Sequence, residues 1–291
     1  MRGPVLVVGS RGNVGAATVR ALVERSVPVR AGVAGPAPAS ATAATPGVES
    51  VHLDLFRPET FGPAVQGIGG LLLLRPPPVS RVGPTLNALI EAAVAAGVPH
   101  IVFSSVAGAD TNRLVPHHRV ETHLRQHAPS WTILRPGFFA QNLADAYRRD
   151  ITEDDRIHLP AGEGSVAFVD TDDIGAVAAG ILAEPGPHRG RGYTLTGPQA
   201  VTFGDLAGML TAALGRHIGY EPATVLGYAR HLRSRGLPIA QVAVQTVLHV
   251  GLRRGDAEHV DPTLSHLLGR PARSIEEYVR DHAATWARPA Q

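Results

Sequence analysis

Short apolar runs recur along the first half of the chain, and segments with helical periodicity separate them. The runs predict buried strands over residues 5–8, 27–33, 48–55, 67–78, 100–108 and 131–139. The periodic segments predict helices over residues 13–25, 58–67, 82–98 and 117–128. Strands that alternate with helices indicate right-handed βαβ units. The expected fold class is therefore α/β, with a doubly wound parallel sheet.

The pattern changes after about residue 150. A strand or loop and then a helix are predicted over residues 166–186, and a strand over 192–198. A helix is predicted over residues 202–215, and helical stretches dominate from Val225 to Trp286. Capping-box spacing marks the start of the first helix, at Thr202/Asp205, and of one later helix, at Ser274/Glu277. We therefore expect one domain over residues 1–150, to which 166–185 return, and a smaller, mostly helical lobe over 186–291 that selects the substrate.

Composition narrows the possible functions. The 291 residues carry a formal net charge of +2, and arginine supplies all of the lysine-plus-arginine charge. Basic and acidic residues are interspersed, which argues against nucleic-acid binding. The absence of cysteine excludes disulfides, thiol nucleophiles and cysteine zinc sites. No apolar run reaches the ~18 residues of a membrane span. With no signal-peptide pattern, we expect a cytoplasmic protein without membrane contact, as a monomer or homodimer.

A glycine-rich turn follows the first predicted strand. Gly9, Gly12 and Gly15 stand between that strand and the first predicted helix. In this context glycines allow a tight turn, close approach of a pyrophosphate and close helix–strand packing. The turn predicts a dinucleotide site of the Rossmann type, the alternative being a glycine turn in an unliganded domain. No Gly-Lys-Ser/Thr follows, which argues against a P-loop.

The acidic residue that normally holds the ribose of NAD is missing. Between Arg25 and Val48 there is no aspartate or glutamate, so nothing there would repel a 2′-phosphate. Arg11 in the turn and Arg30 on the second strand are the nearest cations. NADP is therefore the expected cofactor, with NAD the alternative, and a solvated Arg11 is the competing interpretation.

Taken together, these segments resemble the NmrA-like family of atypical short-chain dehydrogenase/reductase proteins. The segments that carry the resemblance are GSRGNVG, LDLFRPETFGPAVQGIGGLLLLRPPP, TILRPGFFAQN, VDTDDIGAVAAGIL, YTLTGP and LLGRPARSIEEYVRDHAATW. They cover almost the whole chain, and TILRPGFFAQN and LTGP are the most specific.

The resemblance implies an NAD(P)-binding domain and a small substrate lobe. The residues implied for cofactor binding are Gly9, Ser10, Arg11, Gly12, Asn13, Val14, Gly15, Asp54, Leu55, Leu74, Arg75, Pro76, Ser104, Pro136, Gly137 and Phe138. Those implied for the substrate pocket are Phe139 and Asn142.

The chain departs from the family pattern at two places. Many relatives carry arginine where this chain has Ala34, which removes the usual partner of a 2′-phosphate. Short-chain dehydrogenases use a Tyr-x-x-x-Lys pair, and Arg113 and His117 stand at the matching positions here. The usual proton donor is therefore absent.

His117 is the remaining acid–base candidate, because imidazole exchanges protons near neutral pH. Ser105 is a second candidate, and Ser104 and Ser105 could instead cap the end of a strand. His118 is a weaker candidate than His117.

Other polar groups suggest simpler roles. His123 and His127 have i,i+4 spacing, but no third ligand matches, so no metal is expected. Asp170, Asp172 and Asp173 are more simply explained by capping of a helix.

Three functions remain open. The first, which we favour, is an NAD(P)H-dependent reductase of a quinone or conjugated carbonyl, since a cofactor carries the hydride and such acceptors are electrophilic. The second is a redox sensor that binds the dinucleotide and acts through a protein partner. The third is a tailoring enzyme with a structural or recycled cofactor.

Overall fold

A computed structural model of the chain describes residues 3–35, 46–77 and 79–288. Most of the irregular segment expected over residues 35–47 lies outside the described residues. The chain forms two compact units. Unit 1 comprises Met1–Pro136 and Thr171–Leu195, and unit 2 comprises Gly137–Asp170 and Thr196–Gln291.

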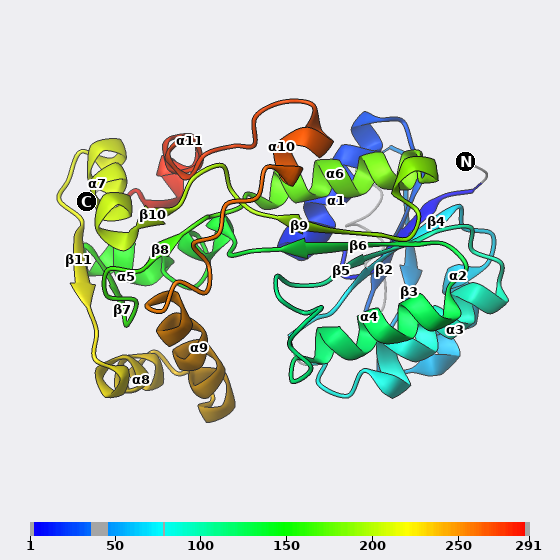
Figure 1. Cartoon of the computed structure of the whole chain (residues 1–291), viewed down its shortest axis with the longest axis horizontal. Helices are drawn as coiled ribbons and strands as arrows, with labels where there is room; N and C mark the ends of the chain where they lie inside the picture. Colours follow the sequence, from blue (N-terminus) through cyan, green and yellow to red (C-terminus); the bar gives the residue numbers. More distant parts are fainter. Residues whose placement is uncertain (1–2, 36–45, 78, 289–291) are drawn as a thin grey trace. The chain divides into compact units, whose positions relative to one another are not determined.

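Unit 1 is built on a seven-stranded parallel sheet with the order β3-β2-β1-β4-β5-β6-β9 (Figure 1). Its strands are β1 (Val5–Val7), β2 (Val29–Val33), β3 (Val48–His52), β4 (Gly70–Leu74), β5 (Ile101–Ser104), β6 (Trp131–Pro136) and β9 (Arg191–Leu195). Strand order reverses between β1 and β4, and ligands of such sheets bind at this point, beyond the carboxyl ends of the strands. The predicted α/β fold with a doubly wound parallel sheet is confirmed.

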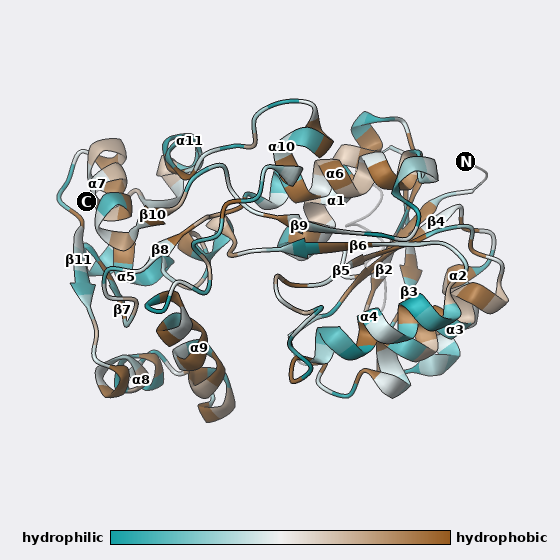
Figure 2. Cartoon of the chain, viewed as in Figure 1, coloured by the Kyte–Doolittle hydropathy of each residue, from teal (hydrophilic) through white to brown (hydrophobic). Residues whose placement is uncertain are grey.

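Helices cover both faces of this sheet. They are α1 (Asn13–Glu24), α2 (Phe61–Val65), α3 (Ala88–Ala95), α4 (Pro116–His127) and α6 (Thr171–Ala183), and a π-helical turn (Gly83–Asn87) leads into α3. On one face α1 packs against α6, where a Cβ on Gly175 would lie 2.7 Å from the Cβ of Ala17. On the other face α2, α3 and α4 bury an apolar core that includes Phe61, Leu86 and Phe103. Figure 2 shows brown, hydrophobic stretches on these helices beside teal, hydrophilic ones.

The borders of unit 1 differ from the domain boundaries expected at residues 150 and 186. The first segment of unit 1 ends with β6 at Pro136, because the chain beyond it packs with the second core. Strand β9 was expected in the smaller lobe, yet it pairs in parallel with β6 and completes the sheet. Periodicity identified this strand but carried no information about its partner. The division into cofactor-binding and substrate-selecting parts stays a prediction.

Unit 2 is mostly helical. Its helices are α5 (Arg148–Glu153), α7 (Phe203–Leu214), α8 (Val225–Ser234), α9 (Ile239–Leu252), α10 (Thr263–Leu268) and α11 (Ile275–Asp281). Strand β7 (Arg156–Leu159) pairs in parallel with β11 (Gly219–Pro222), and β8 (Ser165–Val166) pairs antiparallel with β10 (Val201–Thr202). Both predicted capping boxes are present, at the starts of α7 and α11. In the described part of the chain, no helix is both long and apolar enough to span a lipid bilayer.

Candidate functional site

The turn between β1 and α1 has the backbone shape that an anion site needs. Gly9 has a φ of 63°, in the left-handed region that favours glycine, and its carbonyl accepts a hydrogen bond from the Gly12 amide at 3.0 Å. Gly12 precedes the first turn of α1, which carries no acidic residue and is capped by none of the described side chains. The first amides of such a helix favour a negative group, so the turn fits a dinucleotide phosphate.

The second and third glycines of the turn have different surroundings. A Cβ on Gly12 would meet only the Gly9 oxygen, at 3.5 Å, so a side chain there would extend into the open side of the turn. A Cβ on Gly15 would lie 2.2 Å from the same oxygen. Gly15 therefore lets α1 pack against the turn, and Gly12 leaves space for a ligand.

Side chains around the turn point in different directions. The Ser10 hydroxyl donates to the Gly32 carbonyl at 3.1 Å, which ties the turn to β2. Arg11 and Asn13 are exposed, and Val14 is buried in the core. Only Arg11 among these four places a cation beside the turn.

Arg30 does not belong to this site. It is the second residue of β2, near the amino end of the strand, where its Nε donates to Glu49 at 2.6 Å and its Nη1 donates to the carbonyls of Ala64 and Gln66. Arg30, one of the two nearest cations in the sequence, thus lies away from the carboxyl end of the sheet, where ligands of parallel sheets bind. Ala34 follows β2, and residues 36–45 lie outside the described residues.

Asp54 and Leu55 follow β3 at the carboxyl edge of the sheet. The Asp54 carboxylate accepts a hydrogen bond from the Phe56 amide at 2.9 Å and lies 3.7 Å from Arg57. Leu55 is buried in the core. The Asp54 carboxylate therefore already contacts two groups of its own loop.

Arg75 and His117 form a pair beyond β4. The Arg75 Nε donates to the His117 Nε2 at 3.1 Å, and the Arg75 Nη1 donates to the Val79 carbonyl at 2.6 Å. Burial, and secondarily the Arg75 charge, lower the pKa of His117 to about 4. His117 is therefore a neutral ring at pH 7. Leu74 and Pro76 flank Arg75 and are half-buried.

Ser105, beyond β5, belongs to a buried charge cluster. Its hydroxyl donates to the carboxylate of Glu121 at 2.7 Å, and that fully buried carboxylate also accepts from Arg135 at 2.8 and 2.9 Å. Arg125, four residues further along α4, also donates to this carboxylate at 2.7 Å. Ser104, the last residue of β5, is buried as well.

The sequence pattern did not lead us to expect that Arg135 binds Glu121 in this cluster. An arginine inside the apolar strand over residues 131–136 was the available signal, because a buried charge needs a partner. Arg135 and the Ser105 hydroxyl both use the Oε1 of Glu121. The hydroxyl proton of Ser105 is thus already engaged with a carboxylate.

The remaining expected residues divide between the units. Pro136 ends β6 in unit 1, whereas Gly137, Phe138, Phe139 and Asn142 belong to unit 2. Within unit 2, the Phe138 ring contacts Phe168 edge-on at 5.7 Å and His249 at 6.1 Å. Phe139 forms an isolated parallel bridge with Val169, and the Asn142 carbonyl accepts from the Tyr147 amide.

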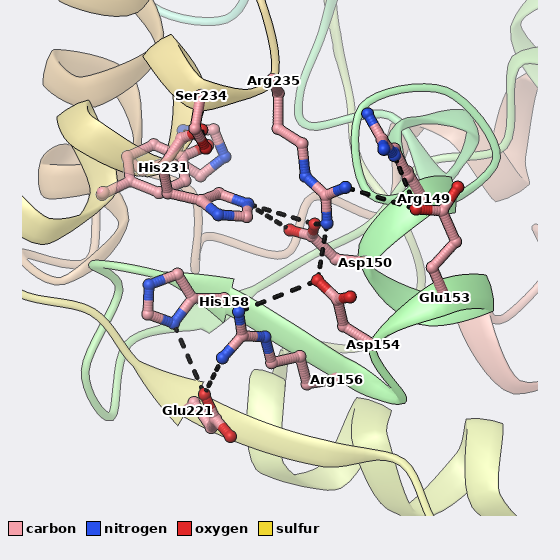
Figure 3. A network of polar contacts seen from close by, with 12 residues as sticks. Arg149, Asp150, Glu153, Asp154, Arg156, His158, Glu221, His231, Ser234 and Arg235 are labelled. Carbon is pink, nitrogen blue, oxygen red and sulfur yellow. Dashed lines mark hydrogen bonds and ion pairs between the residues drawn. The ribbon is translucent and has the colours of Figure 1, made fainter.

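A polar network joins α5 and α8 in unit 2 (Figure 3). The Asp150 carboxylate accepts from His231 at 2.8 Å and from Arg235 at 2.7 Å, and Arg235 also donates to Asp154 at 2.6 Å. These bonds hold α8 in place and touch none of the residues expected at the site.

An open groove of about 870 Å³ lies elsewhere in unit 2. Its walls are the loops at residues 162–165, 222–225 and 253–255, with Glu258. Two arginines, Arg253 and Arg254, and two glutamates, Glu163 and Glu258, line it, so the formal charges of its lining are balanced. None of the expected site residues lines this groove.

The metal and capping candidates have other partners. His123 stacks on His127 with ring centroids 4.0 Å apart and lies 3.3 Å from Glu91. No cluster of three metal-ligating side chains occurs among the described residues.

The three aspartates near α6 have different environments. Asp170 accepts from Gln141 and Arg273 within unit 2. Asp172 forms an ion pair with Arg20, and Asp173 is buried in the first turn of α6. Asp172 and Asp173 are the acidic residues of that turn, where negative charge favours the helix.

Comparison with known proteins identifies the family of this chain. The model of the NmrA-like family matches residues 1–278. The NAD(P)H azoreductase of Xenophilus azovorans is 34% identical over 286 residues, which cover 97% of this chain and 99% of that protein. Quinone oxidoreductase 2 of Escherichia coli (strain K12) is 31% identical over 281 residues, covering 94% and 97%.

Solved structures agree with this comparison. The NADPH-dependent quinone oxidoreductase of Escherichia coli, complexed with NADPH, matches with a TM-score of 0.85 at 31% identity, over 95% of this chain and 99% of that chain. The triphenylmethane reductase of Citrobacter sp., complexed with NADP(H), matches with a TM-score of 0.84 at 26% identity, over 96% and 99%. This chain belongs to the NmrA-like family of atypical short-chain dehydrogenase/reductase proteins, with an NAD(P)-binding domain of the Rossmann type.

Proposed function

We propose that this protein is an NAD(P)H-dependent reductase of a small, electrophilic acceptor such as a quinone or a conjugated carbonyl. The observation that carries the proposal is the turn after β1, which leaves space at Gly12 in front of a helix start free of acidic residues. The relatives named as an azoreductase and a quinone oxidoreductase support the same class of reaction.

The residues proposed to hold the dinucleotide come mainly from the carboxyl edge of the sheet. The turn would bind the pyrophosphate through its amides, Asp54 and Leu55 would lie near the adenine, and Leu74, Arg75 and Pro76 would follow the ribose. Ser104, Pro136, Gly137 and Phe138 would lie near the nicotinamide, and Phe139 and Asn142 would face the substrate. A bound reduced dinucleotide supplies the hydride.

The contacts of the two acid–base candidates favour acceptors that need no early proton. His117 accepts from Arg75 and is neutral at pH 7, and the Ser105 hydroxyl is engaged with Glu121. A simple ketone needs a proton at its oxygen as the hydride arrives, and that help is worth ~10²–10⁴ in rate. A quinone spreads the added charge over its ring and needs the proton later.

We further propose NADP as the preferred cofactor. Arg11 is exposed beside the turn and carries a charge that suits a 2′-phosphate. The chain has no aspartate or glutamate between Arg25 and Val48 that would repel this group.

The test is oxidation of NADPH, followed at 340 nm, with a panel of quinones, an azo dye and an unactivated ketone. We expect turnover with quinones and very slow turnover with the ketone. Gly12→Val is the control, because it fills the open side of the turn and should abolish turnover with every acceptor. Tight NADPH binding without hydride transfer to any acceptor would contradict the proposal and favour a sensor that acts through a protein partner.

A further inference from the structure

The guanidinium of Arg75 is held by two of its three nitrogens. Nε donates to His117 and Nη1 to the Val79 carbonyl, with longer contacts of 3.4 Å to the carbonyls of Pro76 and Pro77. Among the described residues, no acceptor lies within bonding distance of Nη2. Burial lowers the pKa of Arg75, yet arginine stays protonated at neutral pH. Arg75 is thus a fixed cation with one amino group still free to donate.

His117 is the group that fixes this cation. Arginine has no acceptor, so the Nε2 of His117 must accept, and the ring proton must be on Nδ1. The charged groups that face the ring are Arg75, from the end of β4, and Glu121, one turn further along α4. Glu121 is already occupied by Arg125, Arg135 and Ser105. His117 therefore acts here as a neutral acceptor.

The pair lies at the carboxyl edge of the sheet, beside the strand that leads to Ser105. Leu74 of β4 is in register with Ser104 of β5, so Arg75 and Ser105 are the next residues of two adjacent strands. Both leave the carboxyl edge of the sheet beside the point where its strand order reverses. The neutral ring of His117 stacks on Phe103 of β5, with centroids 6.2 Å apart.

We propose that Arg75 stabilises the negative charge that forms on the acceptor, and that His117 is the positioning residue that aims the guanidinium. This inference rests on the proposed reductase function. A quinone gains one hydride, hence two electrons, from the reduced dinucleotide, which becomes NAD(P)⁺. A carbon–hydrogen bond of the nicotinamide breaks, a bond to hydrogen forms on the quinone, and its oxygen becomes negative. Arg75 pairs with that oxygen and keeps its own protons, and water later supplies the proton that completes the hydroquinone.

Substitution of Arg75 separates this role from cofactor binding. Loss of one donor to a developing oxyanion typically lowers kcat by ~10²–10³. We expect Arg75→Gln to lower kcat with a quinone by about this factor, and Arg75→Lys to restore part of it. Because Arg75 is also proposed to lie along the ribose, the dissociation constant of NADPH, from its fluorescence on binding, should rise by no more than a few-fold, far less than kcat falls. Arg81→Gln, an exposed arginine of the same segment, is the matched control and should change neither value.

Two substitutions of His117 separate positioning from proton donation. His117→Gln keeps a neutral acceptor for Arg75, whereas His117→Leu removes it. A positioning role predicts that Gln retains kcat within a few-fold, that Leu lowers it at least about tenfold, and that kcat shows no step at an imidazole pKa between about pH 5.5 and 8.5. A proton donor would lose ~10²–10⁴ in both variants, and the wild-type rate would fall as pH rises.

Nitrogen NMR of the histidine rings measures the protonation state of His117 and requires no turnover. The His117 signal, identified by its loss in His117→Gln, should show a neutral ring protonated on Nδ1 at pH 7. In Arg75→Gln its pKa should rise, because a neighbouring cation is lost. A His117 cation at pH 7, or an unchanged kcat in Arg75→Gln, would overturn this inference and leave the proposed function standing. No turnover by the wild-type chain would contradict the proposed function together with it.

Discussion

The turn after β1 and the Glu121 cluster both belong to unit 1, and they are built in opposite ways. The turn depends on backbone shape, with Gly9 in the left-handed region and Gly12 open to a ligand. The cluster depends on side chains, with one buried carboxylate bonded to Ser105, Arg125 and Arg135. The turn therefore leaves space for a ligand at a helix start, whereas the cluster pairs its own charges. Changes in the turn should alter affinity, and changes in the cluster should alter stability.

The largest effect is expected from Glu121→Gln. It leaves the buried Arg135 without its bidentate partner, since Asp110 at 3.6 Å is the remaining carboxylate near it. Breaking a buried ion pair in this way typically costs about 3–5 kcal/mol. Urea unfolding followed by circular dichroism would measure the loss. Glu153→Gln, in the exposed i,i+4 pair with Arg149, is the control and should leave the unfolding midpoint nearly unchanged. An equally stable Glu121→Gln protein would show that the cluster is not a stability element.

The second effect concerns acid. Burial lowers the pKa of both His117 and His100 to about 4, from the ordinary histidine value of 6.5. Between pH 6.5 and 4 the unfolded chain binds protons that the folded chain does not, so stability falls as pH falls through this window. Across this window each histidine lowers the free energy of unfolding by up to about 3 kcal/mol, because one pKa unit corresponds to about 1.36 kcal/mol.

Unfolding free energies at several pH values would test the acid effect. His117→Gln should flatten the loss of stability between pH 6.5 and 4. His259→Gln, whose side chain is 79% exposed, should leave the loss as it is. Identical slopes for the wild type and His117→Gln would contradict the buried, neutral state of His117.

The third effect tests the turn itself. Gly12→Val should weaken NADPH binding at least about 100-fold, because the side chain takes the space of the pyrophosphate, while the melting temperature stays close to that of the wild type. Gly15→Ala is the matched comparison. Its Cβ would clash with the Gly9 oxygen, so it should lower the melting temperature as well as the affinity. Calorimetric titration with NADPH would measure both variants, and unchanged affinity in Gly12→Val would refute the site.

The smallest effect concerns cofactor choice. Arg11→Ala should weaken NADPH about tenfold and NADH little, since a charge-assisted bond to phosphate is worth about 1.5–3 kcal/mol before solvent screening. Dissociation constants for both cofactors would decide this. Arg20→Ala, which removes a surface ion pair between Arg20 of α1 and Asp172 of α6, should change neither. Tenfold tighter binding of NADH by the unmodified chain would contradict the preference for NADP.

Local patterns predicted most of unit 1 and the glycine turn. The alternation of strands and helices identified the parallel sheet, because its period and turn residues are local properties. The capping boxes of α7 and α11 were also readable, since each depends on residues three positions apart. The place of β9 was not, because its partner β6 lies more than fifty residues earlier. The partners of Arg30 were not readable either, because Glu49, Ala64 and Gln66 lie 19 to 36 residues further along the chain.

The sequence by itself determined the fold class, the glycine turn after the first strand and the lack of the Tyr-x-x-x-Lys pair, since all three follow from residue types at short, fixed spacings. Only the tertiary structure decided the state of the side chains beyond β4 and β5. Arg75 and His117 are 42 positions apart, and Glu121 and Arg135 are 14 apart. Folding brings these groups into a buried place where water no longer screens their charges. Charge and hydrogen bonding there depend on neighbours in space. His117 was therefore a candidate proton donor in the sequence and is a neutral hydrogen-bond acceptor in the structure.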